Sequence, residues 1–245
     1  MATVIAITSG KGGTGKTSLT GGVGSCLAAL GRKVLCIDMD IGMRNLDISL
    51  GMTDLAVMDF SDVLAGRCGL ERSAAAHPDI PGLWLLTAPL SLPGPLPLEG
   101  MKRLVQQARS RFDYILMDAP AGLGDGFRLC AACADRAIVI STTDASALRD
   151  AQRTVAALMK SIPRIHLVVN RVQPRLLRRL HTTIDDAMDT AGLPLLGVVP
   201  EDSQVMLSAN LGRPLILSSR RCASVAYLNI ARRLMGEKVP LMKIR

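Results

Sequence analysis

The chain has 245 residues, of which 49% are hydrophobic and 2% aromatic, so it is long enough for a domain with a sizeable core of aliphatic side chains. The scarcity of aromatic residues argues against a base-stacking surface for single-stranded nucleic acid. The sequence contains no run of 18 apolar residues, so we expect no membrane-spanning helix. The net charge of +8 favours anionic partners such as a nucleotide, acidic lipid or DNA, although a charged surface without a specific partner accounts for it equally well.

Short apolar runs alternate with helix-like segments along the whole sequence. This alternation predicts an α/β fold with a mostly parallel, twisted sheet and helices on both of its faces. The strands are expected at residues 4–8, 33–38, 83–87, 114–118, 137–141, 165–170 and 195–199. The helices are expected at residues 16–30, 59–65, 98–111, 126–134, 145–161, 176–191, 203–210 and 222–235. No linker or repeat divides the sequence, so we expect a single domain over residues 1–237 and a short basic and apolar tail at 238–245.

A glycine-rich segment follows the first expected strand and precedes the first expected helix. It matches the phosphate-binding pattern G-x-x-x-x-G-K-[ST] with Gly10, Lys11, Gly12, Gly13, Thr14, Gly15, Lys16 and Thr17. In such a loop, backbone N–H groups and the positive end of the helix dipole surround phosphate oxygens. Lys16 would add a full charge to the β and γ phosphates, and the Thr17 hydroxyl would ligate Mg²⁺. A bare structural turn is the alternative, and the complete pattern behind a strand argues against it. The fold expected is therefore that of a P-loop NTPase.

A second lysine, Lys11, lies inside this loop, where an ordinary P-loop needs no charge. A cation crowded against Lys16 costs repulsion unless a polyanion lies between the two. Together the two lysines resemble the deviant P-loop of the MinD/ParA group of ATPases, in which the first lysine reaches across a nucleotide-sandwich dimer to the partner's phosphates. The resemblance implies that this chain hydrolyses ATP with Mg²⁺ and forms a homodimer when ATP is bound, with Lys11 and Lys16 as catalytic residues.

Two carboxylates, Asp38 and Asp40, follow the second expected strand at the sheet edge where open parallel sheets bind ligands. Carboxylates there orient an attacking water or hold a magnesium-bound water, or they merely cap a loop. The run from Asp38 to Asp47 resembles the switch segment of the MinD branch of the family, which acts in placing the division septum. That resemblance implies that Asp40 positions the water and that Asp38 lies close to the magnesium site. It also implies that Arg44 and Asn45 move with nucleotide state and face protein regulators of division-site selection.

A further carboxylate, Asp118, ends the apolar run at 114–118. This is the arrangement of a Walker B motif, in which a carboxylate beside the P-loop holds Mg²⁺, usually through water. The run Asp118-Ala-Pro-Ala-Gly122 is similar to the D-x-P-A-G segment of the same family. We therefore expect Thr17, Asp118 and Asp38 to make up the metal site.

Later residues extend the resemblance toward the base of the nucleotide. An asparagine that leaves a strand, as Asn170 does, can read adenine through paired hydrogen bonds. The resemblance also implies that Ser18 contacts the α-phosphate and that the base is flanked by Arg171, Pro200, Glu201 and Asp202. Residues 148–150 resemble the family's dimer-face segment.

Two other classes of function stay open. One is a ParA-like partition or cargo-positioning ATPase that binds DNA through basic residues, which residues 44–47 argue against. The other is an iron–sulfur or redox carrier that uses Cys130 and Cys133, although small cysteines in an alanine-rich helix also suit a buried core. The cluster of Arg175, Arg178 and Arg179 is a lipid or DNA phosphate site, or a solvated helix face.

Localisation follows from the cysteines and the chain ends. No signal peptide precedes the strand that starts near residue 3, so we expect a reducing, cytoplasmic compartment and no disulfides. The tail contains Pro240 and is too short for a stable amphipathic helix, so peripheral attachment to the inner face of the cell membrane stays open.

Overall fold

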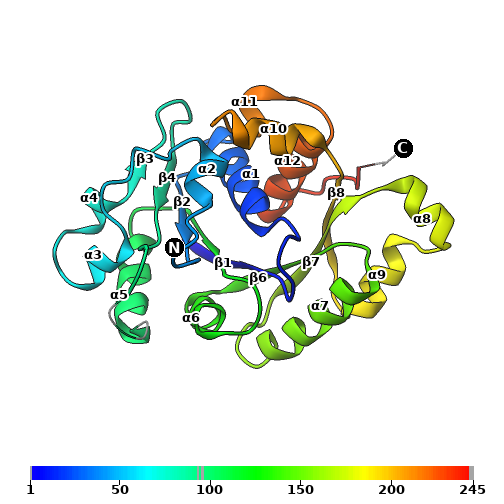
Figure 1. The fold of residues 1–245 in the computed structure, drawn as a ribbon, viewed down its shortest axis with the longest axis horizontal. Helices are drawn as coiled ribbons and strands as arrows, with labels where there is room; N and C mark the ends of the chain where they lie inside the picture. The colour runs from blue at the N-terminus through cyan, green and yellow to red at the C-terminus, as the bar shows by residue number, and fades with distance from the viewer. Residues whose placement is uncertain (1, 93, 95–96, 243–245) are drawn as a thin grey trace.

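A single twisted sheet organises the molecule (Figure 1). The computed structural model describes residues 2–92, 94 and 97–242. Within them the sheet has the strand order β3-β4-β2-β5-β1-β6-β7-β8, and only β3 pairs in the antiparallel sense. The strands are β1 (Thr3–Thr8), β2 (Val34–Asp38), β3 (Ala75–Ala76), β4 (Leu83–Leu86), β5 (Tyr114–Asp118), β6 (Arg136–Ser141), β7 (Ile165–Val172) and β8 (Leu195–Pro200). The predicted fold class is confirmed.

Helices cover both faces of the sheet. The face above it in Figure 1 carries α1 (Lys16–Ala29), α2 (Leu46–Leu50), α10 (Ser203–Asn210), α11 (Leu215–Ser218) and α12 (Ala223–Leu234). The opposite face carries α3 (Phe60–Leu64), α4 (Leu70–Ser73), α5 (Leu98–Arg109), α6 (Asp125–Cys133), α7 (Ala145–Leu158), α8 (Pro174–Leu180) and α9 (Ile184–Ala191). Each layer forms its own apolar core against the sheet, which is why the central strands are apolar on both faces.

The structure differs from the sequence prediction chiefly in short elements. The helix expected at 176–191 is two helices, because His181 takes a left-handed conformation with φ 51° and Thr183 starts a new helix. The Thr183 hydroxyl accepts the Asp186 N–H, and the Asp186 carboxylate accepts the Thr183 N–H, which forms a capping box. The elements α2, α4, α11 and β3 were not predicted, since two to five residues are too few to show a period.

The last described residues run along the edge strand β8. The Arg233 guanidinium donates to the carbonyl oxygens of Leu196 at 2.8 Å, Val239 at 3.1 Å and Pro240 at 2.8 Å, so it ties the tail to that edge. Residues 243–245 of the expected tail lie outside the described part. In the described ranges, no helix combines the length and apolarity that crossing a bilayer requires.

Candidate nucleotide site

The candidate site lies at the carboxyl ends of β1, β2 and β5. Strand β5 lies between the other two, so that Ile7 of β1 and Asp38 of β2 both pair in register with Asp118. The loop from β1 to α1 passes directly over this edge (Figure 1). Residues that are 30 to 100 positions apart in sequence are thereby brought together, as expected for a ligand site in an open parallel sheet.

The glycine loop is held at its two ends by neighbours that leave no room for a side chain. A Cβ on Gly10 would lie 2.3 Å from the carbonyl oxygen of Asp150, and a Cβ on Gly15 would lie 2.2 Å from Nδ2 of Asn170. Gly15 also has φ 94° and forms the N-cap of α1. Asn170 is buried, and its Nδ2 donates to the carbonyl oxygen of Thr14 at 2.7 Å. Elements α7 and β7 therefore hold the two ends of the loop.

Lys16 is the first residue of α1, and its ammonium is directed to the strand ends. Its Nζ donates to Oγ of Ser9 at 3.1 Å. Burial lowers the pKa of Lys16, while Asp118 and Asp40 act to raise it. Both carboxylates therefore lie close enough to interact with this cation, which is the relation that the predicted roles of the three residues require.

Asp38 and Asp118 are two buried carboxylates side by side. The pKa of Asp118 is raised to about 7, chiefly by burial and also by the neighbouring charge of Asp38, while hydrogen bonds from Thr17 and Thr20 and the charge of Lys16 act to lower it. The Thr20 hydroxyl lies 3.0 Å from Oδ1 of Asp118. Asp118 is thus joined to the first two turns of α1, beside the phosphate loop.

Asp38 uses its two oxygens differently. Oδ1 accepts the N–H of Asp40 at 2.9 Å and Oδ2 accepts the N–H of Leu46 at 3.1 Å, and burial raises its pKa. It therefore holds both ends of the segment that carries Asp40 and Arg44. Arg44 has φ 38° and its guanidinium lies 3.9 Å from the Asp47 carboxylate. The place of Asp38 beside magnesium stays a prediction.

The donor set fits a magnesium ion that arrives with a nucleotide. In the described ranges no group of three or more His, Cys, Asp or Glu side chains is placed to hold a metal by itself. What the site offers is the Thr17 hydroxyl and the Asp118 carboxylate, whose pKa the Thr17 hydroxyl acts to lower. Mg²⁺ prefers few protein oxygens together with water and substrate phosphates, so this sparse set suits it.

The residues predicted to contact the base lie beyond the other side of the loop. Arg171 has a left-handed backbone with φ 56°, and its guanidinium forms an ion pair with Glu201 at 2.8 Å. The same guanidinium donates a hydrogen bond to the carbonyl oxygen of Gly13 at 3.4 Å. A hollow of about 410 Å³ opens here, lined by Lys11–Thr14, Thr142–Asp144, Arg171 and Glu201 among others. Asp202 has a structural use, because it accepts the N–H groups of Gln204 and Ala223 and so joins α10 to α12. Its predicted contact with the base stays a prediction.

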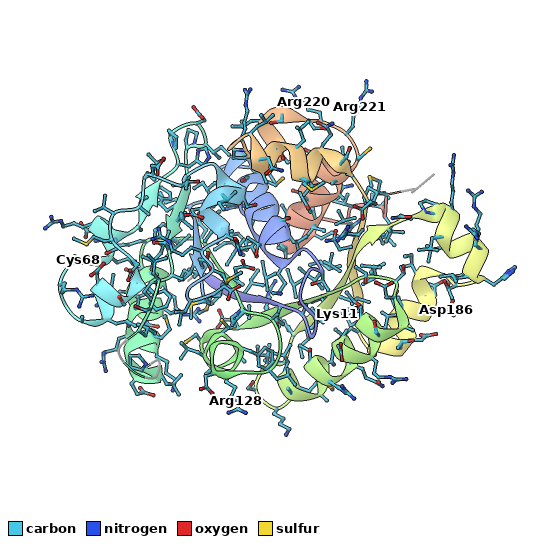
Figure 2. All side chains as sticks on the ribbon, in the orientation of Figure 1. Lys11, Cys68, Arg128, Asp186, Arg220 and Arg221 are labelled. Atoms are coloured by element: carbon cyan, nitrogen blue, oxygen red, sulfur yellow. The ribbon has the colours of Figure 1, made fainter. Side chains whose placement is uncertain are left out.

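Two residues of this site were missed from the sequence. Ser9 precedes the loop, accepts from Lys16 and donates to the carbonyl oxygen of Lys11 at 2.7 Å. Thr20 lies one helical turn after Lys16, and that spacing could have placed it on the face that meets Asp118. Lys11 itself lies at the tip of the loop (Figure 2), where its Nζ donates to Oγ of Ser146 at 3.2 Å.

The cysteines lie in the core or apart from one another. All six, each within the described ranges, are free thiols. Cys130 and Cys133 are buried on α6, and burial raises the pKa of both thiols, that of Cys133 to about 11. Both thiols lie in the buried apolar core against the sheet, so this pair suits core packing.

Comparison with known proteins supplies the family. Residues 5–215 match the model of the CobQ/CobB/MinD/ParA nucleotide binding domain. The septum site-determining protein MinD of Synechocystis sp. is 39% identical over 98% of this chain and 91% of that protein. The corresponding protein of Bacillus subtilis is also 39% identical, over 98% of this chain and 92% of its own length.

Solved structures agree with the sequence relatives. The structure of the MinC:MinD cell division complex of Aquifex aeolicus superimposes with a TM-score of 0.93 at 37% identity, covering 99% of each chain. The MinD of Pyrococcus horikoshii complexed with Mg-ADP has a TM-score of 0.82 at 28% identity, covering 96% of each chain. With the phosphate loop and both carboxylates in place, this chain belongs to the MinD family of septum site-determining P-loop ATPases.

Proposed function

We propose that this MinD-family ATPase works as a dimer switch in which each subunit donates Lys11 to the nucleotide of its partner. The supporting observation is the position of Lys11. It is exposed at the rim of the hollow, and its ammonium donates to the hydroxyl of Ser146 on α7 rather than to a carboxylate. Because the Lys11 ammonium has a neutral hydroxyl as its partner and no opposite charge, little energy is lost when it moves to the triphosphate bound by a second copy of the chain.

Within one subunit the remaining residues divide the work on the phosphates. Lys16 stabilises charge on the β and γ phosphates, together with the loop N–H groups and the N-terminus of α1. Thr17 and Asp118 hold Mg²⁺, which when bound neutralises charge on the transferred phosphoryl group. Asp40 orients the attacking water and accepts its hydrogen bond, and Asp38 keeps Asp40 in place through the backbone N–H at 2.9 Å.

Recognition of the base follows from the same loop. One N–H of the Asn170 amide goes to Thr14, which leaves the second N–H and the carbonyl oxygen for adenine. The Arg171–Glu201 pair closes the hollow beside it, and Pro200 positions the backbone that flanks the base. Ser18 lies on the first turn of α1, where its hydroxyl reaches the α-phosphate.

We propose that the switch segment, residues 38–47, changes conformation with the bound nucleotide and so controls the binding of other proteins. The Asp38 contacts with Asp40 and Leu46 connect the phosphate site to Arg44 and Asn45. The Aquifex relative is known in a complex with MinC, which supports a division regulator as the partner of this chain as well. We place the protein in the cytoplasm, with peripheral attachment to the anionic inner face of the cell membrane.

The test is ATPase activity as a function of protein concentration. A switch that hydrolyses ATP only as a dimer has a specific activity that rises with concentration and then saturates. Lys11→Ala should remove that rise while retaining nucleotide binding, and Ser146→Ala, which removes the hydroxyl partner of Lys11, should keep it. A wild-type specific activity that is constant over a hundredfold range of concentration would contradict the proposal.

A further inference from the structure

Ser9 directly follows β1, and its fully buried side chain contacts both lysines of the glycine loop. The Lys16 ammonium donates to Oγ of Ser9 at 3.1 Å. The Ser9 hydroxyl in turn donates to the carbonyl oxygen of Lys11 at 2.7 Å. The two lysines, whose ammonium groups serve different nucleotides in the proposed dimer, are therefore joined through one buried side chain.

The direction of these two hydrogen bonds follows from the chemistry of the groups. An ammonium has only N–H donors, so the Ser9 oxygen must be the acceptor toward Lys16. A hydroxyl has a single proton, and here that proton is directed to the Lys11 carbonyl. Hydrogen bonds in a chain polarise one another, so a charged donor strengthens the bond that the hydroxyl donates. The charge of Lys16 therefore supports the contact that holds Lys11.

This contact restrains the backbone of Lys11 and leaves its side chain exposed. The described part of the chain has no cis peptide bond, so the N–H of Gly12 points opposite to the Lys11 carbonyl. That N–H is directed away from the buried Ser9 hydroxyl, and Gly12 lines the hollow of about 410 Å³. The Lys11 ammonium lies at the loop tip (Figure 2), where it donates to Ser146. Ser9 therefore fixes the place from which the long Lys11 side chain extends.

Two other buried hydroxyls provide comparisons for Ser9. Oγ1 of Thr14 lies 3.4 Å from the same Lys11 carbonyl oxygen, which is longer than usual for a hydroxyl donor. Ser25 is buried on α1, and its hydroxyl has no hydrogen-bond partner among the described residues. Thr14→Val therefore removes a weaker bond to this carbonyl, and Ser25→Ala removes a buried serine hydroxyl that makes no such bond.

We propose that Ser9 is a positioning residue for Lys11 and acts through the Lys11 backbone. In each subunit the Ser9 hydroxyl, oriented by Lys16, holds the peptide group that follows Lys11, so that the exposed side chain starts from a fixed place when it reaches toward a second copy. The proposal rests on the dimer switch proposed above and names a residue that prepares it. A serine with this role affects dimer formation more than nucleotide binding within one subunit, where Lys16 has the phosphates as its partners.

The specific ATPase activity as a function of protein concentration tests this role. A neutral hydrogen bond is worth roughly a fivefold change in an equilibrium constant, and a dimer contains two of these contacts, so Ser9→Ala should raise the concentration of half-maximal activity about 25-fold. Its Kd for ADP with Mg²⁺, measured by calorimetry, should stay close to that of wild type. Thr14→Val should give a smaller shift, and Ser25→Ala should behave as wild type. A Ser9→Ala shift no larger than that of Ser25→Ala would overturn the proposal, as would an equal loss of affinity for ADP.

Trypsin cleavage after Lys11 tests the same contact in the nucleotide-free protein. A protease cuts a folded segment when it opens locally, so the rate follows the population of the open form. Ser9→Ala should be cut after Lys11 roughly fivefold faster than wild type, and Ser25→Ala should be cut as wild type is. Mass spectrometry assigns the cut, and cleavage after Lys160, exposed beyond the end of α7, corrects for a general loss of stability. Equal corrected rates in Ser9→Ala and wild type would overturn the proposal.

The failure of this proposal is distinguishable from failure of the proposed function. If the wild-type specific activity is constant at all concentrations, the dimer switch falls and the role of Ser9 falls with it. If the wild type shows the rise and Ser9→Ala shows it at the same concentrations, the switch stands and the role of Ser9 alone is overturned.

Discussion

Asp118 makes the stability of the nucleotide-free protein depend on pH in a calculable way. Its carboxyl has a pKa of about 7 in the folded protein, against 3.8 for the unperturbed group, chiefly because of burial. Between these two pKa values the folded state therefore binds more protons than the unfolded chain, and stability falls as the pH rises. Asp118→Asn removes the titration, while its side-chain oxygen can still accept from Thr17 and Thr20.

The size of the effect follows from the two pKa values. Each pH unit between them is worth about 1.4 kcal/mol, so the ionised carboxylate costs the folded protein about 4 kcal/mol well above pH 7. From pH 5.5 to pH 8 the stability of Asp118→Asn relative to wild type should rise by about 2 kcal/mol, because the wild-type penalty stops growing above pH 7. Asp38 is retained in both proteins, and its repulsion of the Asp118 carboxylate is part of the cost that Asp118→Asn relieves.

The assay is urea denaturation of both proteins at several pH values, without nucleotide and with EDTA present to remove divalent cations. The predicted result is a variant that is more stable than wild type at pH 8, by a margin that narrows toward pH 5.5. Adding Mg²⁺ and ATP should restore stability to the wild type alone. A stability difference that is the same at pH 5.5 and pH 8 would refute the argument, as would a variant that is less stable at pH 8.

Three other predictions follow from the site and the core. Gly10→Ala should destabilise the fold by about 1–3 kcal/mol and impair ATP binding measured by calorimetry, because its Cβ meets the backbone of α7. The control Gly69→Ala, with open space around it and outside the candidate site, should bind ATP as wild type does. Asn170→Ala leaves a loop carbonyl without its partner, so it should cost about 1–3 kcal/mol in denaturation and raise the Kd for ATP. A thiol reagent should label Cys68 and Cys222 rapidly in the native protein and the other four cysteines only after unfolding; fast labelling of all six would contradict the core assignment.

Much of the architecture could be predicted because regular alternation of elements is a strong signal. The mostly parallel sheet and the MinD-like ATPase function are confirmed, while the phosphate-binding role of residues 10–17 stays a prediction. The join between α8 and α9 was missed, because the left-handed backbone at His181 and the capping box at Thr183 interrupt an otherwise helix-like stretch. A residue such as His181 carries little sequence signal for that conformation.

The site was predictable in its motifs and less so in its supporting contacts. The pattern around Lys16 indicates a phosphate loop, yet it does not show that Asn170 donates to the loop backbone. The same limit applies to Asp202, whose two oxygens join α10 to α12, and to Asp38, whose oxygens hold the switch segment. Such contacts depend on tertiary packing between residues far apart in sequence, and no local pattern encodes them.

The contact of each Lys11 with the nucleotide of the partner subunit is tested most directly by light scattering of chromatographed protein with ATP and Mg²⁺. The comparison uses a background of Asp40→Ala, in which slow hydrolysis should let any dimer accumulate. We predict that Asp40→Ala has a molar mass by light scattering of twice the 26.1 kDa of one chain. The double variant Lys11→Ala/Asp40→Ala should have the mass of one chain while still binding ATP. A double variant that dimerises at the same protein concentration as Asp40→Ala would contradict the account.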